Sequence, residues 1–395
     1  MVYCKATFMP RFTHGFTYFY TKFDRCNSAE NVDMSTDAFL KKHSTLLLRN
    51  CDELKQEFLA LKTPRDVASL LEVSYDRLVY HLYRIPENRK YVEFSISKKS
   101  GHPRTISAPS TALKLIQRKL SQVLYSVYEP KASIHGFLPA RSIVTNAKQH
   151  LRKRFVLNID LTDFFPSIHF GRVRGIFIAP PYNLPKEVAT VLAQICCYSG
   201  RLPQGAPTSP VVSNMVCARM DSQLRLLAQE FKCTYTRYAD DITFSTTLPN
   251  FPAEIACSIT EEDKLKTIVG ERLLLVIQNN DFEINENKVR LQHKSRHQEV
   301  TGLTVNQFPN VKRDYVRKIS SMLHAWNQFG LDSVEQRYIE KRSKELGISK
   351  EDVPPFREVL RGKINFLGMI RGKDNEIYRK YLSWYNKLSS RVIPF

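Results

Sequence analysis

Residues 233–246 read CTYTRYADDITFST, and this stretch decides the fold. Two β-rich runs, Thr234–Tyr238 and Ile242–Thr246, meet at the adjacent aspartates Asp240 and Asp241. The pattern predicts a β-hairpin with the acidic pair at or beside its tip. Because aspartate is common in turns, an ordinary polar turn is the simpler interpretation of the tetrapeptide alone.

A second acidic stretch favours a functional interpretation. Residues 155–168, FVLNIDLTDFFPSI, predict an apolar strand that ends in Asp160. Three carboxylates that converge from two strands raise one another's pKa unless a cation offsets their charge. Two Mg²⁺ ions about 3.5–4 Å apart would offset it and could clamp the attacking and leaving oxygens of a phosphoryl transfer. We therefore predict that Asp160, Asp240 and Asp241 are catalytic metal ligands.

The composition is that of a globular, basic chain. Its 395 residues suffice for two or three compact units, and 43% of them are hydrophobic. Lysine and arginine number 59 against 39 aspartates and glutamates, which gives a net charge of +20. This excess predicts a polyanionic partner, most simply a nucleic acid.

The eight cysteines show neither a CxxC pair nor a spacing typical of zinc sites. Cys196 and Cys197 are adjacent, which is poor geometry for a disulfide, so we expect reduced thiols in a cytoplasmic protein. No apolar run approaches the length of a membrane span, and the N-terminus lacks the apolar core of a signal peptide. The sequence therefore predicts no membrane partner.

The other elements follow from periodicity, caps and chain breakers. Thr63-Pro64 is typical of a helix start, and residues 63–84 loosely resemble a helix-turn-helix. A strand, a basic turn with Lys98 and Lys99, and a second strand are expected over 91–109. Helices are expected over 52–84, 111–128, 167–197, 208–230, 261–278 and 311–395, and strands near 282–291 and 298–305.

Five stretches, in this order, resemble those of a reverse transcriptase. They are KKSGHPR at 98–104, HGF at 135–137, NIDLTDFFPSI at 158–168, LPQGAPTSP at 202–210 and YADD at 238–241. Two further patterns are similar to those of bacterial retron reverse transcriptases: NAKQH at 146–150 matches NAxxH, and 300–302 match VTG. The resemblance runs from about Tyr91 to the end of the chain.

This resemblance implies an α+β right-hand polymerase fold. Fingers and palm would combine an antiparallel palm sheet with helices, and the thumb would be α-helical. The implied divisions are an N-terminal arm or extension at 1–50, a fingers region at 51–155, a palm at 156–310 with part of the fingers (about 168–205) inserted, and a thumb at 311–395.

The resemblance assigns two Mg²⁺ ions, for which Mn²⁺ can substitute, to Asp160, Asp240 and Asp241. It adds Leu161 to the metal set. Phe165 matches a steric gate whose ring would fill the volume of a ribose 2′-hydroxyl. Plain core packing is the competing interpretation for Phe165 and for the adjacent Phe164. We accept packing for Phe164 and the steric gate for Phe165.

The nucleotide would be held by residues of KKSGHPR at 98–104 and of LPQGAPTSP at 202–210. Arg104 would contact the phosphates or stack on the base, and Lys98 or Lys99 would face the terminal phosphate. Gln204 and Gly205 would lie along the nucleotide, since glycine permits a close backbone approach. A further set is assigned to the RNA or the template–primer: Asn146, His150, Ala239, Lys288, Val300, Thr301 and Gly302.

The implied function is RNA-directed DNA synthesis from dNTPs. The template would be a cognate structured non-coding RNA, and priming from an internal guanosine 2′-hydroxyl would leave branched RNA–DNA (msDNA). A separate effector protein in an anti-phage defence system is the expected partner. Three alternatives stay open: a group II intron-like or other prokaryotic reverse transcriptase, a scaffold that binds an RNA–DNA hybrid and restrains an effector, and a DNA-binding regulator using residues 63–84.

Overall fold

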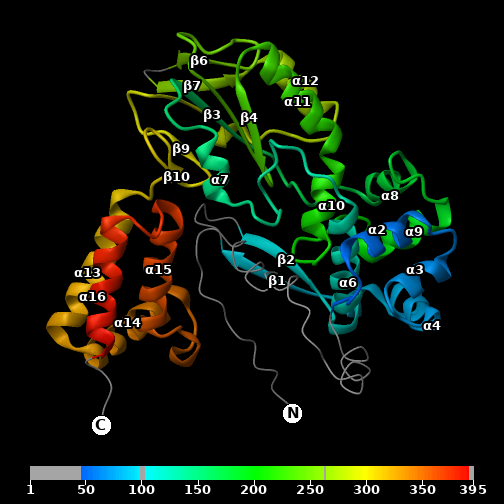
Figure 1. Ribbon diagram of the computed structural model, residues 1–395, viewed down its shortest axis with the longest axis horizontal. Coiled ribbons are helices and arrows are strands. Elements are labelled where there is room, and N and C mark those ends of the chain that lie inside the picture. The colour runs from blue at the N-terminus through cyan, green and yellow to red at the C-terminus, as the bar shows by residue number, and fades with distance from the viewer. Residues whose placement is uncertain (1–45, 98–102, 262–263, 391–395) are drawn as a thin grey trace. The chain divides into compact units, whose positions relative to one another are not determined.

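The computed structural model describes residues 46–97, 103–261 and 264–390 (Figure 1). The chain divides into two compact units. One, which we call the sheet unit, holds the described residues of 46–141 and 154–291. The other, which we call the C-terminal unit, holds 142–153 and the described residues of 292–390.

A four-stranded sheet in the order β4-β5-β3-β8 forms the centre of the sheet unit. Its strands are β3 Phe155–Asp160, β4 Thr234–Tyr238, β5 Asp241–Thr246 and β8 Arg290–His293, and the boundary between the two units falls within β8, after Leu291. β5 pairs antiparallel with both β3 and β4. Ile242–Thr246 of β5 are buried throughout, as expected for a central strand that carries Ile, Thr and Phe. The hairpin predicted from residues 233–246 is confirmed.

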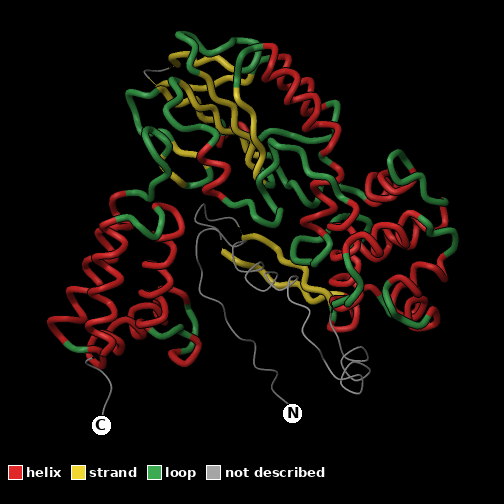
Figure 2. Tube along the Cα trace, viewed as in Figure 1, coloured by secondary structure: helices red, strands yellow, loops and turns green. Residues whose placement is uncertain are grey.

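The sheet unit also contains helices α10 Ser209–Val216, α11 Ala218–Glu230 and α12 Glu271–Gln278. Figure 2 shows the helices in red and the strands in yellow. α11 packs against β4 and against α12. Leu224 and Leu227 of α11 share one hydrophobic core with Phe244 of β5. The long helix predicted over 208–230 is present as two helices that meet at Cys217.

The remaining helices of the sheet unit pack on one another. They are α2 Cys51–Leu59, α3 Pro64–Leu70, α4 Tyr75–Val79 with a π-helical turn Tyr80–Arg84, α5 Glu87–Lys90, α6 Thr111–Val127, α8 Phe170–Ile178 and α9 Lys186–Cys196. Asn50 and Thr63 begin α2 and α3 with capping boxes, which satisfy two backbone N–H groups each. The helix start predicted at Thr63-Pro64 is confirmed.

Two hairpins complete the sheet unit. β1 Tyr91–Ser97 pairs with β2 Pro103–Pro109, as predicted, and β6 Ala256–Glu261 pairs with β7 Lys264–Val269. The helix predicted over 261–278 is therefore wrong in its first half, because the β-branched run Thr267-Ile268-Val269 pairs with β6. The strand predicted near 282–291 is also shorter: a 3₁₀ turn, Glu286–Lys288, precedes β8.

The C-terminal unit contains a helical bundle, as predicted. Its helices are α13 Arg313–Phe329, α14 Leu331–Leu346, α15 Phe356–Arg371 and α16 Glu376–Ser390, with a 3₁₀ turn at Lys350–Asp352. Trp326 meets Phe356 and Tyr385 edge-on, with ring centroids 6.3 and 5.5 Å away. The short helix α7 Ile143–Lys148 and strands β9 Glu299–Val300 and β10 Leu303–Thr304 belong to the same unit. None of the helices in the described ranges is long and apolar enough to cross a membrane.

Candidate active site

The acidic pair lies at a two-residue turn between β4 and β5. Tyr238 and Asp241 face each other across the hairpin, so only Ala239 and Asp240 form the turn. Ala239 is buried and has a φ of 58°. A non-glycine residue in this left-handed region costs about 1–3 kcal/mol, so surrounding contacts must hold the turn in place.

The third aspartate lies beside this turn. Asp160 at the end of β3 is the register partner of Asp241 at the start of β5. The backbone N–H of Leu161 donates to the carbonyl of Asp240 over 3.1 Å. The fold thus places two of the predicted catalytic aspartates on the paired ends of β3 and β5, and the third, Asp240, in the β4–β5 turn beside them. Leu161 itself is buried, and its N–H ties β3 to that turn.

The site is electrostatically strained. Burial, then the Asp240 carboxylate, then the Asp160 carboxylate raise the pKa of Asp241 to about 7. Burial and the Asp160 carboxylate also raise the pKa of Asp240. These shifts are what carboxylates show when they converge without enough positive charge. A bound cation would remove this penalty, and carboxylate oxygens are ligands that hard divalent metal ions prefer.

Lys288 supplies part of the missing positive charge. Its Nζ lies 2.7 Å from Oδ2 of Asp160, and it opposes the pKa rise at both other aspartates. No three acidic, histidine or cysteine side chains of the described ranges lie close enough to hold a metal by themselves. In this structure the counter-ion of Asp160 is the ammonium group of Lys288.

Arg104 lies on the β1–β2 hairpin, which we call the fingers hairpin, and its positive charge acts on Asp240. It lies exposed on β2, opposite Ile96, and it opposes the pKa rise of Asp240. Its placement suits a contact to an anionic nucleotide approaching the aspartates. Lys98 and Lys99 lie outside the described residues.

Gln204 and Gly205 contact the fingers hairpin through the backbone. The Gln204 carbonyl accepts a hydrogen bond of 2.9 Å from the N–H of Ser107 in β2. Gly205 has a φ of 127°, and a Cβ there would come within 2.9 Å of the Ser107 carbonyl oxygen. Glycine is therefore needed for a close approach to the protein's own strand, which the sequence did not indicate.

Phe165 is buried in a cluster of rings. Its centroid lies 5.3 Å from that of Phe164 and 6.0 Å from that of Phe137 in the HGF stretch. Phe164 stacks on Phe282 at 5.6 Å. Packing thus accounts for Phe164, while Phe165 joins the segment after Asp160 to the HGF stretch.

The NAxxH and VTG patterns lie side by side in the C-terminal unit. Asn146 in α7 and His150 just after it are buried. Thr301 and Gly302, with φ of 46° and 80°, form the turn between β9 and β10, and Thr301 Oγ1 donates to the Ile143 carbonyl over 3.4 Å. Within the described ranges neither amide atom of Asn146 finds a hydrogen-bond partner, so internal packing does not explain this amide.

Comparison with known proteins decides the family. The family described as Reverse transcriptase (RNA-dependent DNA polymerase) matches residues 96–305, more than half of the chain. Retron Mx65 reverse transcriptase of Myxococcus xanthus is 37% identical over 67% of this chain and 62% of its own length. Retron Ec86 reverse transcriptase of Escherichia coli is 32% identical over 66% of this chain and 76% of its own length. The chain belongs to the bacterial retron reverse transcriptases.

The similarity covers only part of some of these relatives. Retron Mx162 reverse transcriptase of Myxococcus xanthus is 31% identical, with 59% of its length covered, so this retron reverse transcriptase spans about three fifths of the two Myxococcus relatives. A solved telomerase from Candida albicans aligns over 76% of this chain and 63% of its own at 10% identity, with a TM-score of 0.43.

Family membership confirms the predicted α+β right-hand polymerase fold and implies a dependence on divalent metal. Three features of the retron reverse transcriptase were not predicted. They are the ion pair of Lys288 with Asp160, the hydrogen bond from the Leu161 N–H to the Asp240 carbonyl, and the buried ion pair of Arg237 with Asp221. The first joins residues 128 positions apart, and no local pattern marks it.

Proposed function

We infer that this retron reverse transcriptase is an RNA-directed DNA polymerase whose Asp160, Asp240 and Asp241 hold two Mg²⁺ ions, with Mn²⁺ as a substitute. The observation that carries this is the pairing of Asp160 with Asp241 beside the Asp240 turn, in a field that raises the pKa of both turn-side carboxyls. When bound, such ions activate a primer hydroxyl and neutralise the departing pyrophosphate. Leu161 remains part of the proposed metal set.

The chain's own residues then select and orient the dNTP. Arg104 binds its phosphates or base, and Lys98 or Lys99 faces the terminal phosphate. The Ser107–Gln204 hydrogen bond holds the fingers hairpin on the loop along which the nucleotide would lie. Phe165 excludes a ribose 2′-hydroxyl by a steric clash, and contacts with the rings of Phe137 and Phe164 hold its own ring.

These roles correspond to a division of the polymerase into regions. We assign 51–155 to the fingers, 156–310 to the palm with about 168–205 inserted from the fingers, and 311–395 to the thumb. Residues 1–50 form an N-terminal extension in this division.

We further propose that the template is a cognate structured non-coding RNA, primed from an internal guanosine 2′-hydroxyl to give msDNA. The support is the contact between the NAxxH and VTG segments and the names of the relatives, which are retron enzymes. Asn146, His150, Val300, Thr301 and Gly302 would contribute to RNA binding from one place in the C-terminal unit. Ala239 and Lys288 would contact the template–primer. A separate effector protein in a cytoplasmic anti-phage system completes the proposal.

The product tests this proposal directly. Protein expressed with its own locus should copurify with DNA joined to RNA through a 2′–5′ branch. A debranching enzyme should then separate the two and shift the DNA on a denaturing gel. An Asp240→Asn variant of the same locus provides the control and should yield no DNA. DNA that lacks the branch, or that forms only with an external primer, would refute msDNA synthesis but leave the polymerase assignment intact.

A further inference from the structure

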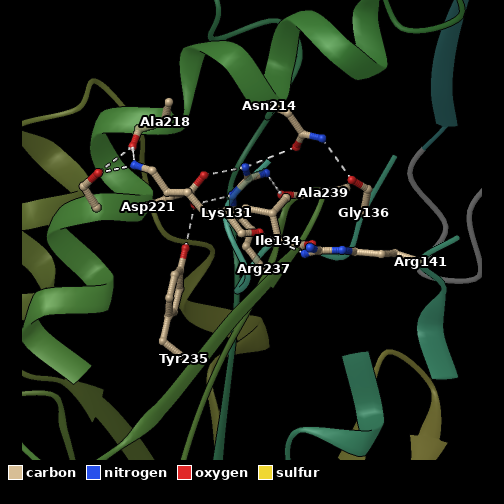
Figure 3. A network of polar contacts seen from close by, with 11 residues as sticks. Lys131, Ile134, Gly136, Arg141, Asn214, Ala218, Asp221, Tyr235, Arg237 and Ala239 are labelled. Atoms are coloured by element: carbon tan, nitrogen blue, oxygen red, sulfur yellow. Dashed lines mark hydrogen bonds and ion pairs between the residues drawn. The ribbon is translucent and has the colours of Figure 1, made fainter. Parts of the chain in front are cut away.

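A buried ion pair contacts the turn formed by Ala239 and Asp240 (Figure 3). Arg237 of β4 and Asp221 of α11 are both fully buried. Arg237 Nε donates to Asp221 Oδ1 over 2.7 Å, and Nη2 donates to Oδ2 over 2.8 Å. Tyr235 donates its hydroxyl to Asp221 Oδ1 over 2.7 Å, which fixes the carboxylate that orients the arginine.

The rest of the guanidinium is directed at the turn. Nη1 of Arg237 donates to the carbonyl of Ala239 over 3.0 Å. Nη2 also reaches Oδ1 of Asn214 at 3.2 Å, and Asn214 Nδ2 donates to the Gly136 carbonyl over 2.9 Å. One arginine thus joins α10, α11, β4 and the HGF stretch to the residue that precedes Asp240.

Gly136 supports the same residue from the other side. A Cβ at position 136 would come within 2.4 Å of the Ala239 nitrogen, closer than real Cβ contacts allow. The backbone of the HGF stretch also runs along β4, because His135 N–H donates to the Arg237 carbonyl over 2.9 Å. The left-handed Ala239 is therefore held by a donor at its carbonyl and by close packing at its nitrogen.

Stability alone gives no reason for such a pair. Replacing a buried ion pair by apolar residues of similar volume is often neutral or stabilising, because burying both charges is costly. The pair instead fixes geometry, because one planar guanidinium can donate to a carboxylate and to the carbonyl of a strained residue at the same time.

We propose that Arg237, held by Asp221, is a positioning residue that fixes the Ala239 turn and thereby sets the Asp240 and Asp241 carboxylates against Asp160 for metal binding. The inference rests on the proposed ligand roles of the three aspartates. Loss of partners that orient metal ligands lowers metal affinity or activity by about 10- to 100-fold in other metalloproteins.

The test measures binding of MnCl₂ to the whole chain by electron paramagnetic resonance, alongside primer-extension kinetics. Removing one partner would strand a buried charge, so the variant is Arg237→Met/Asp221→Leu. Arg237→Lys is the second variant, because it keeps the buried charge but cannot bind the carboxylate and the Ala239 carbonyl at once. Thr246→Val is the matched control, because Thr246 is buried at the far end of β5 and its hydroxyl donates to the Lys232 carbonyl.

We expect the Mn²⁺ concentration for half-saturation to rise about tenfold or more in both variants. The kcat should fall while the KM for template–primer stays unchanged, and Thr246→Val should match the wild type. A folded double variant with wild-type Mn²⁺ affinity and kcat would overturn the inference. If the double variant does not fold, the same results in Arg237→Lys decide it. Asp240→Asn distinguishes failure of the positioning role of Arg237 from failure of the proposed ligand roles of the aspartates. Wild-type Mn²⁺ binding by Asp240→Asn would overturn the ligand assignment itself.

Discussion

Replacing Asp241 with asparagine should stabilise the metal-free protein by an amount that grows as the pH rises above about 4 and is complete above about pH 7. The Asp241 carboxyl has a pKa of about 7 in the folded chain against an ordinary value of 3.8. Because the folded-state pKa is the higher one, the folded state keeps a proton that the unfolded state has lost. Stability therefore falls as the pH rises from about 4 to about 7, and the full cost is present above pH 7.

The size of the effect follows from the shift. About 3 pKa units at about 1.4 kcal/mol each give a ceiling of about 4 kcal/mol. The Asp241 side chain keeps some solvent exposure, which screens its charge, so we expect about 2 kcal/mol, or about 2–3 °C in Tm for a chain of this length. Asparagine cannot ionise, so Asp241→Asn should gain this amount at pH 8 and almost nothing at pH 4.

Thermal unfolding in EDTA at pH 4, 6 and 8 is the assay. Asp76→Asn on the exposed side of α4 is the control and should change stability by less than about 0.5 kcal/mol at every pH. Added Mg²⁺ should stabilise the wild type at pH 8 more than Asp241→Asn. An Asp241→Asn protein that is no more stable at pH 8 than the wild type would show that this carboxylate is not strained, and the reasoning would fail.

Three further predictions concern activity. Asp240→Asn should abolish primer extension while far-ultraviolet circular dichroism stays unchanged, because a ligand charge is removed and the packing is kept; normal extension would end the two-metal assignment. Phe165→Ala should raise the ratio of ribonucleotide to deoxynucleotide incorporation, and an unchanged ratio would leave only a packing role. Alanine at the exposed cations Arg313, Arg361 and Lys373 should flatten the dependence of log affinity for RNA on log salt. The slope should change by about one unit for each phosphate that is no longer neutralised. Slopes equal to those of the wild type would show that these charges face bulk solvent.

The parts of the site that sequence predicted are those with local causes. The hairpin with the acidic pair at or beside its tip, the β-rich runs that flank the pair and the strand ending in Asp160 each follow from neighbouring residues, and the structure has all three. The helical C-terminal bundle likewise follows from periodicity within each helix.

The parts that were missed depend on distant partners. Arg237 within a β-rich run looks like an ordinary strand cation, and only the carboxylate of Asp221, 16 positions earlier, makes it a buried one. The strand Lys264–Val269 was predicted as helix because its partner β6 decides its conformation. The ion pair of Lys288 with Asp160 has no signal in either local sequence.

The joining of α7 to the β9–β10 hairpin has a consequence for synthesis on the ribosome. Thr301 binds the carbonyl of Ile143, 158 positions earlier, and the sheet unit's residues 154–291 are encoded between them. At about 5–20 residues per second, the hairpin emerges about 10–30 s after the helix that it contacts. During that interval Ile143 and Val144, which are buried in the finished protein, have no native cover from this hairpin. A fragment that begins at Gln292 would have the converse defect, so dissection of the C-terminal unit has to carry residues 142–153 along with it.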